Sequence, residues 1–221
     1  MKKFLYLAIL TILPMAAFSQ DNYGKYLEGA VPLVDGKVVF NREVAARTLT
    51  AEQIFNTLSQ WATLEYSGED GQMISNDPAI KRITVRGIEQ AQVRVGLFPS
   101  KIDINYFLLI DCLDGGCNLS FVRFIYTNNP ASKDPNEQIK AEEYITDRYA
   151  LNKAGTKLAG GTGDYRKRTI DLVDNVTGTI EETLAKYMAD LENNKIDTGA
   201  PANQQTATTA QPAQHRIAKI R

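Results

Sequence analysis

The feature that most constrains the fold is a pair of alternating segments on either side of Asp114 and Gly115. Apolar side chains recur at every second position before this dipeptide and again after it, which is the period of a β-strand with one buried face. Asp-Gly favours the two-residue turn of a β-hairpin, so the two segments are predicted to pair as antiparallel strands. The apolar pairs in this register are Ile110 with Leu119, Leu108 with Phe121, and Ile104 with Ile125.

The start of the chain predicts its compartment. Lys2 and Lys3 precede an apolar run over residues 4–18, which is shorter than the ~20 residues that cross a bilayer. Ala17 and Ser19 then place small residues at the positions that a signal peptidase reads. We therefore expect a secretory signal over residues 1–19 and a periplasmic or secreted mature chain without a transmembrane segment. No cysteine lies directly after the apolar run, so no lipid anchor is expected.

The hairpin register also places Cys112 opposite Cys117. The two residues occupy a non-hydrogen-bonded position, where Cα atoms lie ~4.5 Å apart, at the short end of the range that a disulfide spans. Two cysteines in an exported chain favour a disulfide over free thiols or a metal pair. A thioredoxin-like redox role is not expected, because four residues separate the cysteines rather than two.

Charge and histidine content exclude several classes of protein. The chain carries 25 basic and 26 acidic residues, so no strong positive field recruits nucleic acid. The only histidine, His215, falls in a segment rich in Ala, Thr, Gln and Pro. Histidine-based metal sites and catalytic triads need a histidine held in a packed site. We therefore expect no catalytic residue, no metal and no cofactor.

The remaining patterns predict two helices and the other strands. Thr50 and Gln53 form a capping box that opens a helix over residues 50–66. A long helix follows over residues 164–191 with Gly178 inside it, at a cost of ~1 kcal/mol relative to alanine. The strand segments are 38–44, 83–86 and 92–97, the last two joined by a turn at 87–91.

These elements predict one α+β domain. An antiparallel sheet with one apolar face needs a cover, which the N-terminal helix and the long C-terminal helix supply by packing on that face. Residues 20–29 are expected to form a lead-in, residues 30–193 the domain, and residues 194–221 a disordered tail. The basic run 166–168 is expected to be a solvated first turn of the long helix.

The two faces of the hairpin provide the candidate sites. The apolar face and the helices are expected to enclose a pocket for a small amphipathic ligand, and the opposite face is apolar enough to meet a protein or glycan partner. Arg123 falls opposite Tyr106 on the apolar face, where it makes either an end-of-sheet salt bridge or an anion contact. The predicted pocket residues are Trp61, Tyr106, Leu108, Phe121, Arg123 and Tyr187. The predicted interaction face is Phe107, Leu109, Val122, Phe124 and Tyr126.

Several short motifs between residues 26 and 191 resemble a bacterial family. That family consists of exported proteins carrying a domain of unknown function with a TATA-binding-protein-like (TBP-like) fold. The resemblance implies a curved antiparallel sheet that grips helices, in a TBP-like or helix-grip-like arrangement, and it implies no catalytic residues. It does not imply DNA binding, because a fold does not determine a function. The motifs are Val31-Pro32, residues 35–40, the Trp61 helix, Tyr144-Ile145-Thr146-Asp147 and Gly163-Asp164-Tyr165-Arg166.

The leading interpretation is an exported, non-catalytic binding or envelope-interaction domain that holds a small amphipathic molecule between helix and sheet. An envelope hydrolase is the alternative, and it needs two carboxylates facing one cleft with a raised pKa on one of them. A purely structural envelope protein is the third interpretation, and it would have a filled core without a cavity.

Overall fold

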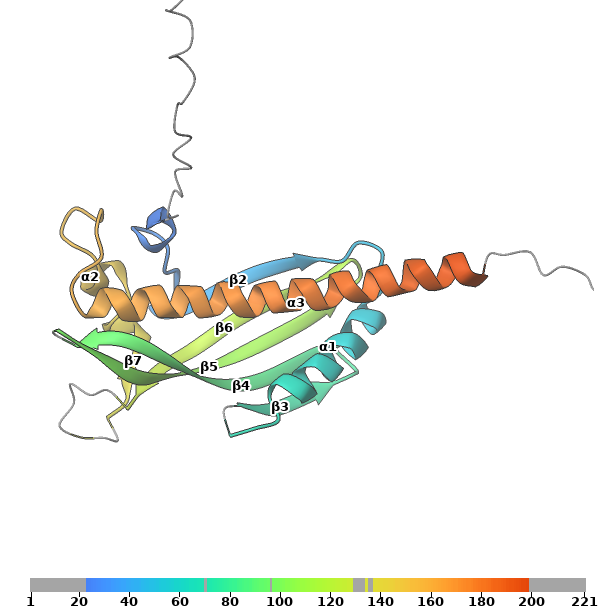
Figure 1. Cartoon of the computed structure of the whole chain (residues 1–221), viewed down its shortest axis with the longest axis horizontal. Coiled ribbons are helices and arrows are strands. Elements are labelled where there is room, and N and C mark those ends of the chain that lie inside the picture. Colours follow the sequence, from blue (N-terminus) through green and yellow to red (C-terminus); the bar gives the residue numbers. More distant parts are fainter. Residues whose placement is uncertain (1–22, 70, 96, 129–133, 135–136, 199–221) are drawn as a thin grey trace, which may run out of the picture.

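The computed structural model describes residues 23–69, 71–95, 97–128, 134 and 137–198 (Figure 1). The predicted signal peptide, residues 20–22 of the lead-in and residues 199–221 of the tail lie outside this part of the chain. No helix of the described residues is long and apolar enough to cross a membrane. The elements are η1 (Tyr23–Tyr26), β1 (Leu33–Val34), β2 (Lys37–Ala45), α1 (Ala51–Glu65), β3 (Gly71–Asp77), β4 (Arg82–Val95), β5 (Phe98–Leu113), β6 (Gly116–Thr127), β7 (Ile139–Lys140), η2 (Ala141–Glu143), α2 (Asp147–Ala150) and α3 (Thr162–Thr198).

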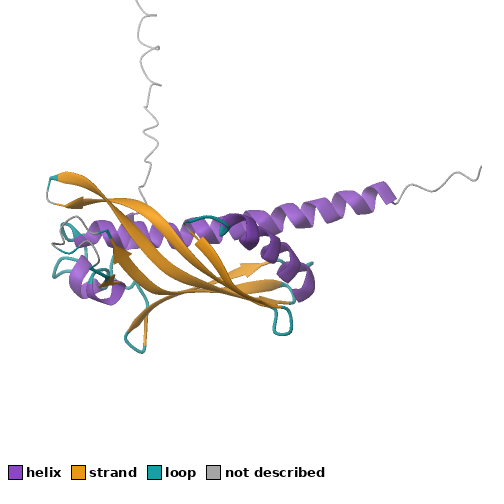
Figure 2. Cartoon of the chain, turned by 90° about the horizontal axis from the view of Figure 1, so that it is seen from below, coloured by secondary structure: helices purple, strands orange, loops and turns teal. Residues whose placement is uncertain are grey.

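The strands form one antiparallel sheet in the order β1-β2-β6-β5-β4-β3, and β7 adds to β6. Helices α1 and α3 lie on one face of this sheet (Figure 1). Within the described part of the chain, no helix lies on the opposite face (Figure 2). The α+β fold with a sheet covered on one face by an N-terminal and a long C-terminal helix is therefore confirmed.

Helix α1 forms where its capping residues predict it. Thr50 accepts a hydrogen bond from the backbone N–H of Gln53, and the Gln53 side chain accepts one from the backbone N–H of Thr50. These reciprocal bonds satisfy two donors that the first turn leaves unpaired. The helix then buries one apolar stripe against the sheet, consisting of Ile54, Phe55, Leu58 and Ala62.

The β5–β6 hairpin has the predicted register only near its turn. Leu108 pairs with Phe121 as expected, but a β-bulge at Arg123 of β6, opposite Tyr106, shifts the pairing by one residue, so that Asn105 rather than Ile104 faces Ile125. Arg123 adopts a φ of 56° at this bulge, and its side chain is exposed rather than on the apolar face. Because successive strand residues point to opposite faces, one extra residue reverses every later side chain.

The bulge overturns part of the predicted interaction face. Phe124 and Tyr126 were expected on the open face, yet both lie in the core, with 2% and 0% of their surface exposed. Phe124 packs edge-to-face on Phe40 and stacks on Tyr106. Phe107, Leu109 and Val122, which lie between the register shift and the Asp114–Gly115 turn, are half-buried. They alternate with core residues and therefore lie on the face away from the helices.

Strand β4 is one continuous strand, so the predicted turn at residues 87–91 is wrong. Its whole length pairs with β5, from Arg82 opposite Asp111 to Val95 opposite Phe98. Its other edge pairs with β3, a polar edge strand that the sequence pattern did not predict. Gly87 resembles a turn signal in the sequence, but here it makes room for an aromatic ring from the neighbouring strand.

Helix α3 is longer than expected at both ends. It begins at Thr162 rather than Asp164 and continues to Thr198, so residues 194–198 extend the helix instead of starting a tail. Arg166 in its second turn is fully buried, which contradicts the prediction of a solvated turn at residues 166–168. The guanidinium group donates hydrogen bonds to backbone carbonyls of the N-terminal segment and of the α2 region, and these bonds replace its hydration.

The two cysteines are cross-strand partners, as predicted; the structure has both as free thiols, and a disulfide between them stays a prediction. Cys112 and Cys117 are buried, and burial raises the pKa of each thiol to about 12. Disulfide formation starts from a thiolate. A buried thiol that stays protonated therefore resists oxidation.

Candidate functional site

A groove lies between the C-terminal half of α1, the middle of β4 and one side of α3. Its deeper part is a cavity of about 300 Å³. A second hollow of about 410 Å³ shares Glu65, Glu89, Val176 and Thr179 with the first, so the two are parts of one site, here called the α1–β4–α3 groove. The deeper part is lined by Trp61, Glu65, Tyr66, Glu89, Tyr106, Val176 and Thr179.

The sequence of β4 explains why the groove is not filled. Ile83 and Val85 point toward the helices and are fully buried. The next residues on the same face of the strand are Gly87, Glu89 and Ala91. Two of them are small and the third is charged, so this stretch supplies little apolar volume beneath α3. The break in the apolar alternation is what leaves the sheet open to the groove.

A pair of tyrosines forms the floor. Gly87 is the register partner of Tyr106, and a Cβ atom at residue 87 would collide with the Tyr106 ring. The ring therefore lies across the glycine, and its hydroxyl reaches the hydroxyl of Tyr66 at 3.1 Å. Tyr106 also stacks on Phe124, with ring centroids 6.0 Å apart. These contacts hold the floor rigid.

Both tyrosines stay neutral over the physiological pH range. Burial is the main cause that raises the pKa of Tyr106 to about 12; the hydrogen bond with Tyr66 lowers this pKa, and the negative charges of Glu89 and Glu65 raise it. Burial raises the pKa of Tyr66 as well, together with the charge and hydrogen bond of Tyr106. The groove therefore offers neutral hydroxyl groups under a negative potential from two carboxylates.

Trp61 forms the wall next to this pair. Its ring meets Tyr66 edge-to-face, with centroids 5.7 Å apart. The indole Nε1 is buried and has no hydrogen-bond partner among the described residues. A buried donor without an acceptor costs ~1–3 kcal/mol, and an acceptor placed in the groove would remove that cost.

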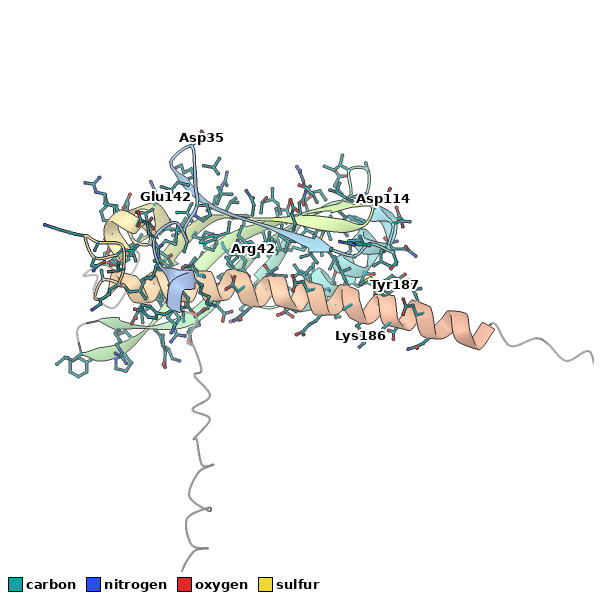
Figure 3. All side chains as sticks on the ribbon, turned by 90° about the horizontal axis from the view of Figure 1, so that it is seen from above. Asp35, Arg42, Asp114, Glu142, Lys186 and Tyr187 are labelled. Carbon is teal, nitrogen blue, oxygen red and sulfur yellow. The ribbon has the colours of Figure 1, made fainter. Side chains whose placement is uncertain are left out.

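The structure brings together two of the predicted pocket residues, Trp61 and Tyr106. Leu108 and Phe121 are fully buried in the core instead of lining a cavity. The Arg123 guanidinium lies outside, 5.7 Å from the Phe107 ring. Tyr187 belongs to the C-terminal half of α3 (Figure 3), eight residues and therefore about 12 Å beyond the last α3 residue of the groove.

Sequence reasoning missed the two carboxylates. Glu65 follows the apolar stripe of α1, where nothing in the pattern distinguishes it from a solvated residue. Glu89 did have a signal, because it interrupts the alternation of a strand on the side that faces the helices. Among the described residues no group of three or more His, Cys, Asp and Glu side chains could hold a metal ion.

The comparisons with known proteins agree with this architecture. The profile of a domain of unknown function with TBP-like fold, DUF4468, matches residues 40–127. No curated protein matches the sequence. A TBP-like protein from Parabacteroides distasonis is 19% identical, with a TM-score of 0.58 over 70% of this chain and 97% of its own, which shows the fold alone.

A second solved structure is more similar in sequence. It is a DUF4468 family protein from Bacteroides ovatus, 33% identical to this chain with a TM-score of 0.64. The alignment covers 73% of this chain and 94% of that one. With this identity over nearly the whole relative, the chain belongs to the DUF4468 family of domains of unknown function with a TBP-like fold.

Proposed function

We propose that this domain is a non-catalytic binding module of an exported protein and that it holds a small amphipathic molecule in the α1–β4–α3 groove. The lining of the groove supports this proposal, because it combines aromatic rings with carboxylates. Aromatic faces of Trp61, Tyr66 and Tyr106 suit an apolar body, and the carboxylates of Glu65 and Glu89 suit a polar or cationic group. The export signal remains a prediction from the sequence.

The observation that carries the proposal is the unpartnered indole N–H of Trp61. Buried donors in folded proteins are almost always satisfied, so an exception beside a cavity of about 300 Å³ marks the place where a ligand acceptor would bind. The proposed ligand therefore carries an acceptor oxygen next to its apolar part.

Native mass spectrometry of the protein purified from its own envelope fraction tests this proposal. We expect a reproducible added mass that disappears on denaturation. Trp61→Phe keeps an aromatic ring but removes the donor, and we expect the bound fraction to fall by roughly tenfold, equivalent to one lost hydrogen bond. Leu64→Ser, on the exposed side of the same helix, is the matched control and should retain the added mass. A wild-type protein without any added mass would contradict the proposal.

The two carboxylates support a second candidate function. Glu65 and Glu89 line the same cavity, which is the arrangement that a carboxylate-dependent hydrolase needs. Such an enzyme would also need one carboxyl with a raised pKa to act as the general acid. Glu65→Gln and Glu89→Gln separate the two functions. In a hydrolase each change abolishes turnover of a glycoside substrate, whereas in a binding module the wild type shows no turnover and the changes alter affinity only.

A further inference from the structure

The tip of the β4–β5 hairpin exposes two large apolar side chains. Leu97 is 92% exposed and Phe98 74% exposed, although the same strands bury most of their apolar residues nearer the centre of the sheet. The tip stands at one end of the molecule in Figures 1 and 2. Two neighbouring apolar side chains of this size leave apolar surface in contact with water, which costs free energy. The feature is independent of the α1–β4–α3 groove, because neither residue lines it.

Two hydrogen bonds attach β4 to α3 close to the hairpin tip, so the backbone that leads to the tip is held in place. The backbone N–H of Arg94 donates to Asp164 Oδ2 at 2.8 Å. The Arg168 Nε donates to the carbonyl oxygen of Gln92 at 2.9 Å. Both bonds attach β4 to the first turns of the long helix within a few residues of the tip. Leu97 and Phe98 therefore project from a fixed frame.

Two exposed cations flank the apolar tip. Arg94 and Lys101 lie on the two strands of the hairpin, each three residues from its nearer tip residue, and both side chains are exposed. Three strand residues span about 10 Å. An apolar tip that enters a bilayer interface by about 5–10 Å would place these cations at the depth of the lipid phosphates.

We propose that the β4–β5 tip inserts Leu97 and Phe98 into the surface of an anionic lipid bilayer, with Arg94 and Lys101 contacting the headgroup phosphates. The shape and the charge together favour lipid over a protein partner. A convex tip buries its apolar side chains in a soft medium without a matching pocket, and the flanking cations complement anionic headgroups. Binding of this kind is reversible, because two side chains bury far less area than a transmembrane helix.

Co-sedimentation with vesicles tests the proposal. The full chain is mixed with vesicles of phosphatidylcholine alone and of an equal mixture of phosphatidylcholine and phosphatidylglycerol. We expect stronger binding to the mixed vesicles, weakening as salt is added. The double variant Leu97→Ser/Phe98→Ser should lower the partition coefficient at least about tenfold. Arg94→Gln/Lys101→Gln should remove the preference for the anionic vesicles.

Leu64→Ser is the matched control, since Leu64 is 78% exposed but lies on α1, and it should bind vesicles like the wild type. Circular dichroism checks that every variant is folded. Wild-type protein that binds neither kind of vesicle overturns the proposal, as does a tip variant that binds as well as the wild type. If light scattering instead finds a dimer that the tip variant abolishes, without vesicle binding, the tip contacts a second copy and the lipid proposal is wrong.

Discussion

Arg166 joins parts of the chain that lie far apart in the sequence. Its guanidinium donates to the carbonyl oxygens of Tyr26 at 2.6 Å, Ile145 at 2.8 Å and Leu27 at 2.5 Å. It also pairs with Asp147 at 2.7 Å. The planar fork of arginine fits several acceptors at once, which a lysine does not. One buried side chain thus fastens the N-terminal segment and the α2 region to α3.

Replacing Arg166 by alanine should therefore lower the free energy of unfolding by about 3–5 kcal/mol, because three carbonyls and a carboxylate lose their partner. Arg168→Ala, an exposed change in the same turn, should cost less than about 1 kcal/mol. Urea denaturation measures both. Similar losses for the two variants would show that the buried hydrogen bonds are not the cause.

Gly87 contributes to stability because the Tyr106 ring lies across it. Gly87→Ala should lower the free energy of unfolding by about 1–3 kcal/mol, since the new methyl group displaces the Tyr106 ring. A double-mutant cycle with Tyr106→Ala isolates the contact. We expect the Gly87→Ala cost to shrink when the ring is absent. An unchanged cost would point to strand propensity instead of the ring.

At the scale of elements, β4 and α3 define the site together. On the face of β4 that points toward the helices, Gly87, Glu89 and Ala91 supply little apolar volume. Helix α3 passes over this stretch and lines the groove with Val176 and Thr179. Figure 3 shows Arg42 of β2 next to α3, where its guanidinium lies 3.3 Å from an Asp174 oxygen. This pair lies among the contacts that position α3 over the sheet.

Gly178 lies in α3 and, unlike Gly87, is not in close contact with another described side chain. A Cβ atom there meets no described atom within 4 Å, so the glycine is not required by a close contact. Gly178→Ala should raise the free energy of unfolding by about 1 kcal/mol, through helix propensity alone. Thermal denaturation gives the measurement. A loss of stability would mean that the backbone near residue 178 must depart from regular helix.

At the scale of the whole molecule, buried hydroxyl and thiol groups predict how stability depends on pH. Burial raises the pKa of Tyr106 and Tyr165 to about 12 from an ordinary value of 10.0, and that of both cysteines to about 12 from 9.0. In the unfolded chain these groups lose protons at their ordinary values, while in the folded protein they keep them. Stability is therefore full below pH 9 and falls as the pH rises toward about 12.

Urea denaturation at increasing pH, followed by circular dichroism, should trace this fall. Tyrosinate absorbance supplies an independent signal, because the buried tyrosines should ionise together with unfolding and the exposed ones before it. Complete tyrosine ionisation while the protein is still folded would contradict the burial that the structure describes.

Local chemistry made much of the fold predictable from the sequence. The Asp114–Gly115 turn, the Thr50–Gln53 capping box and the alternation around them depend on residues a few positions apart. They were enough for α1, for the long α3 and for the hairpin register as far as Phe107. The TBP-like resemblance added the arrangement of the elements, which the comparisons confirm.

Contacts between residues far apart in the chain decided the rest. The bulge at Arg123 of β6 reverses the later side chains of that strand and places Phe124 and Tyr126 in the core, where Phe124 contacts Phe40 of β2 and Tyr106 of β5. The role of Gly87 depends on a ring 19 residues away, and Arg166 finds its acceptors up to 140 residues away. The sequence by itself determined α1, most of α3 and the strands of the β5–β6 hairpin, because periodicity and capping are local. Only the tertiary structure decided which side chains meet in the groove, because register and burial are set by neighbours that the local pattern does not contain.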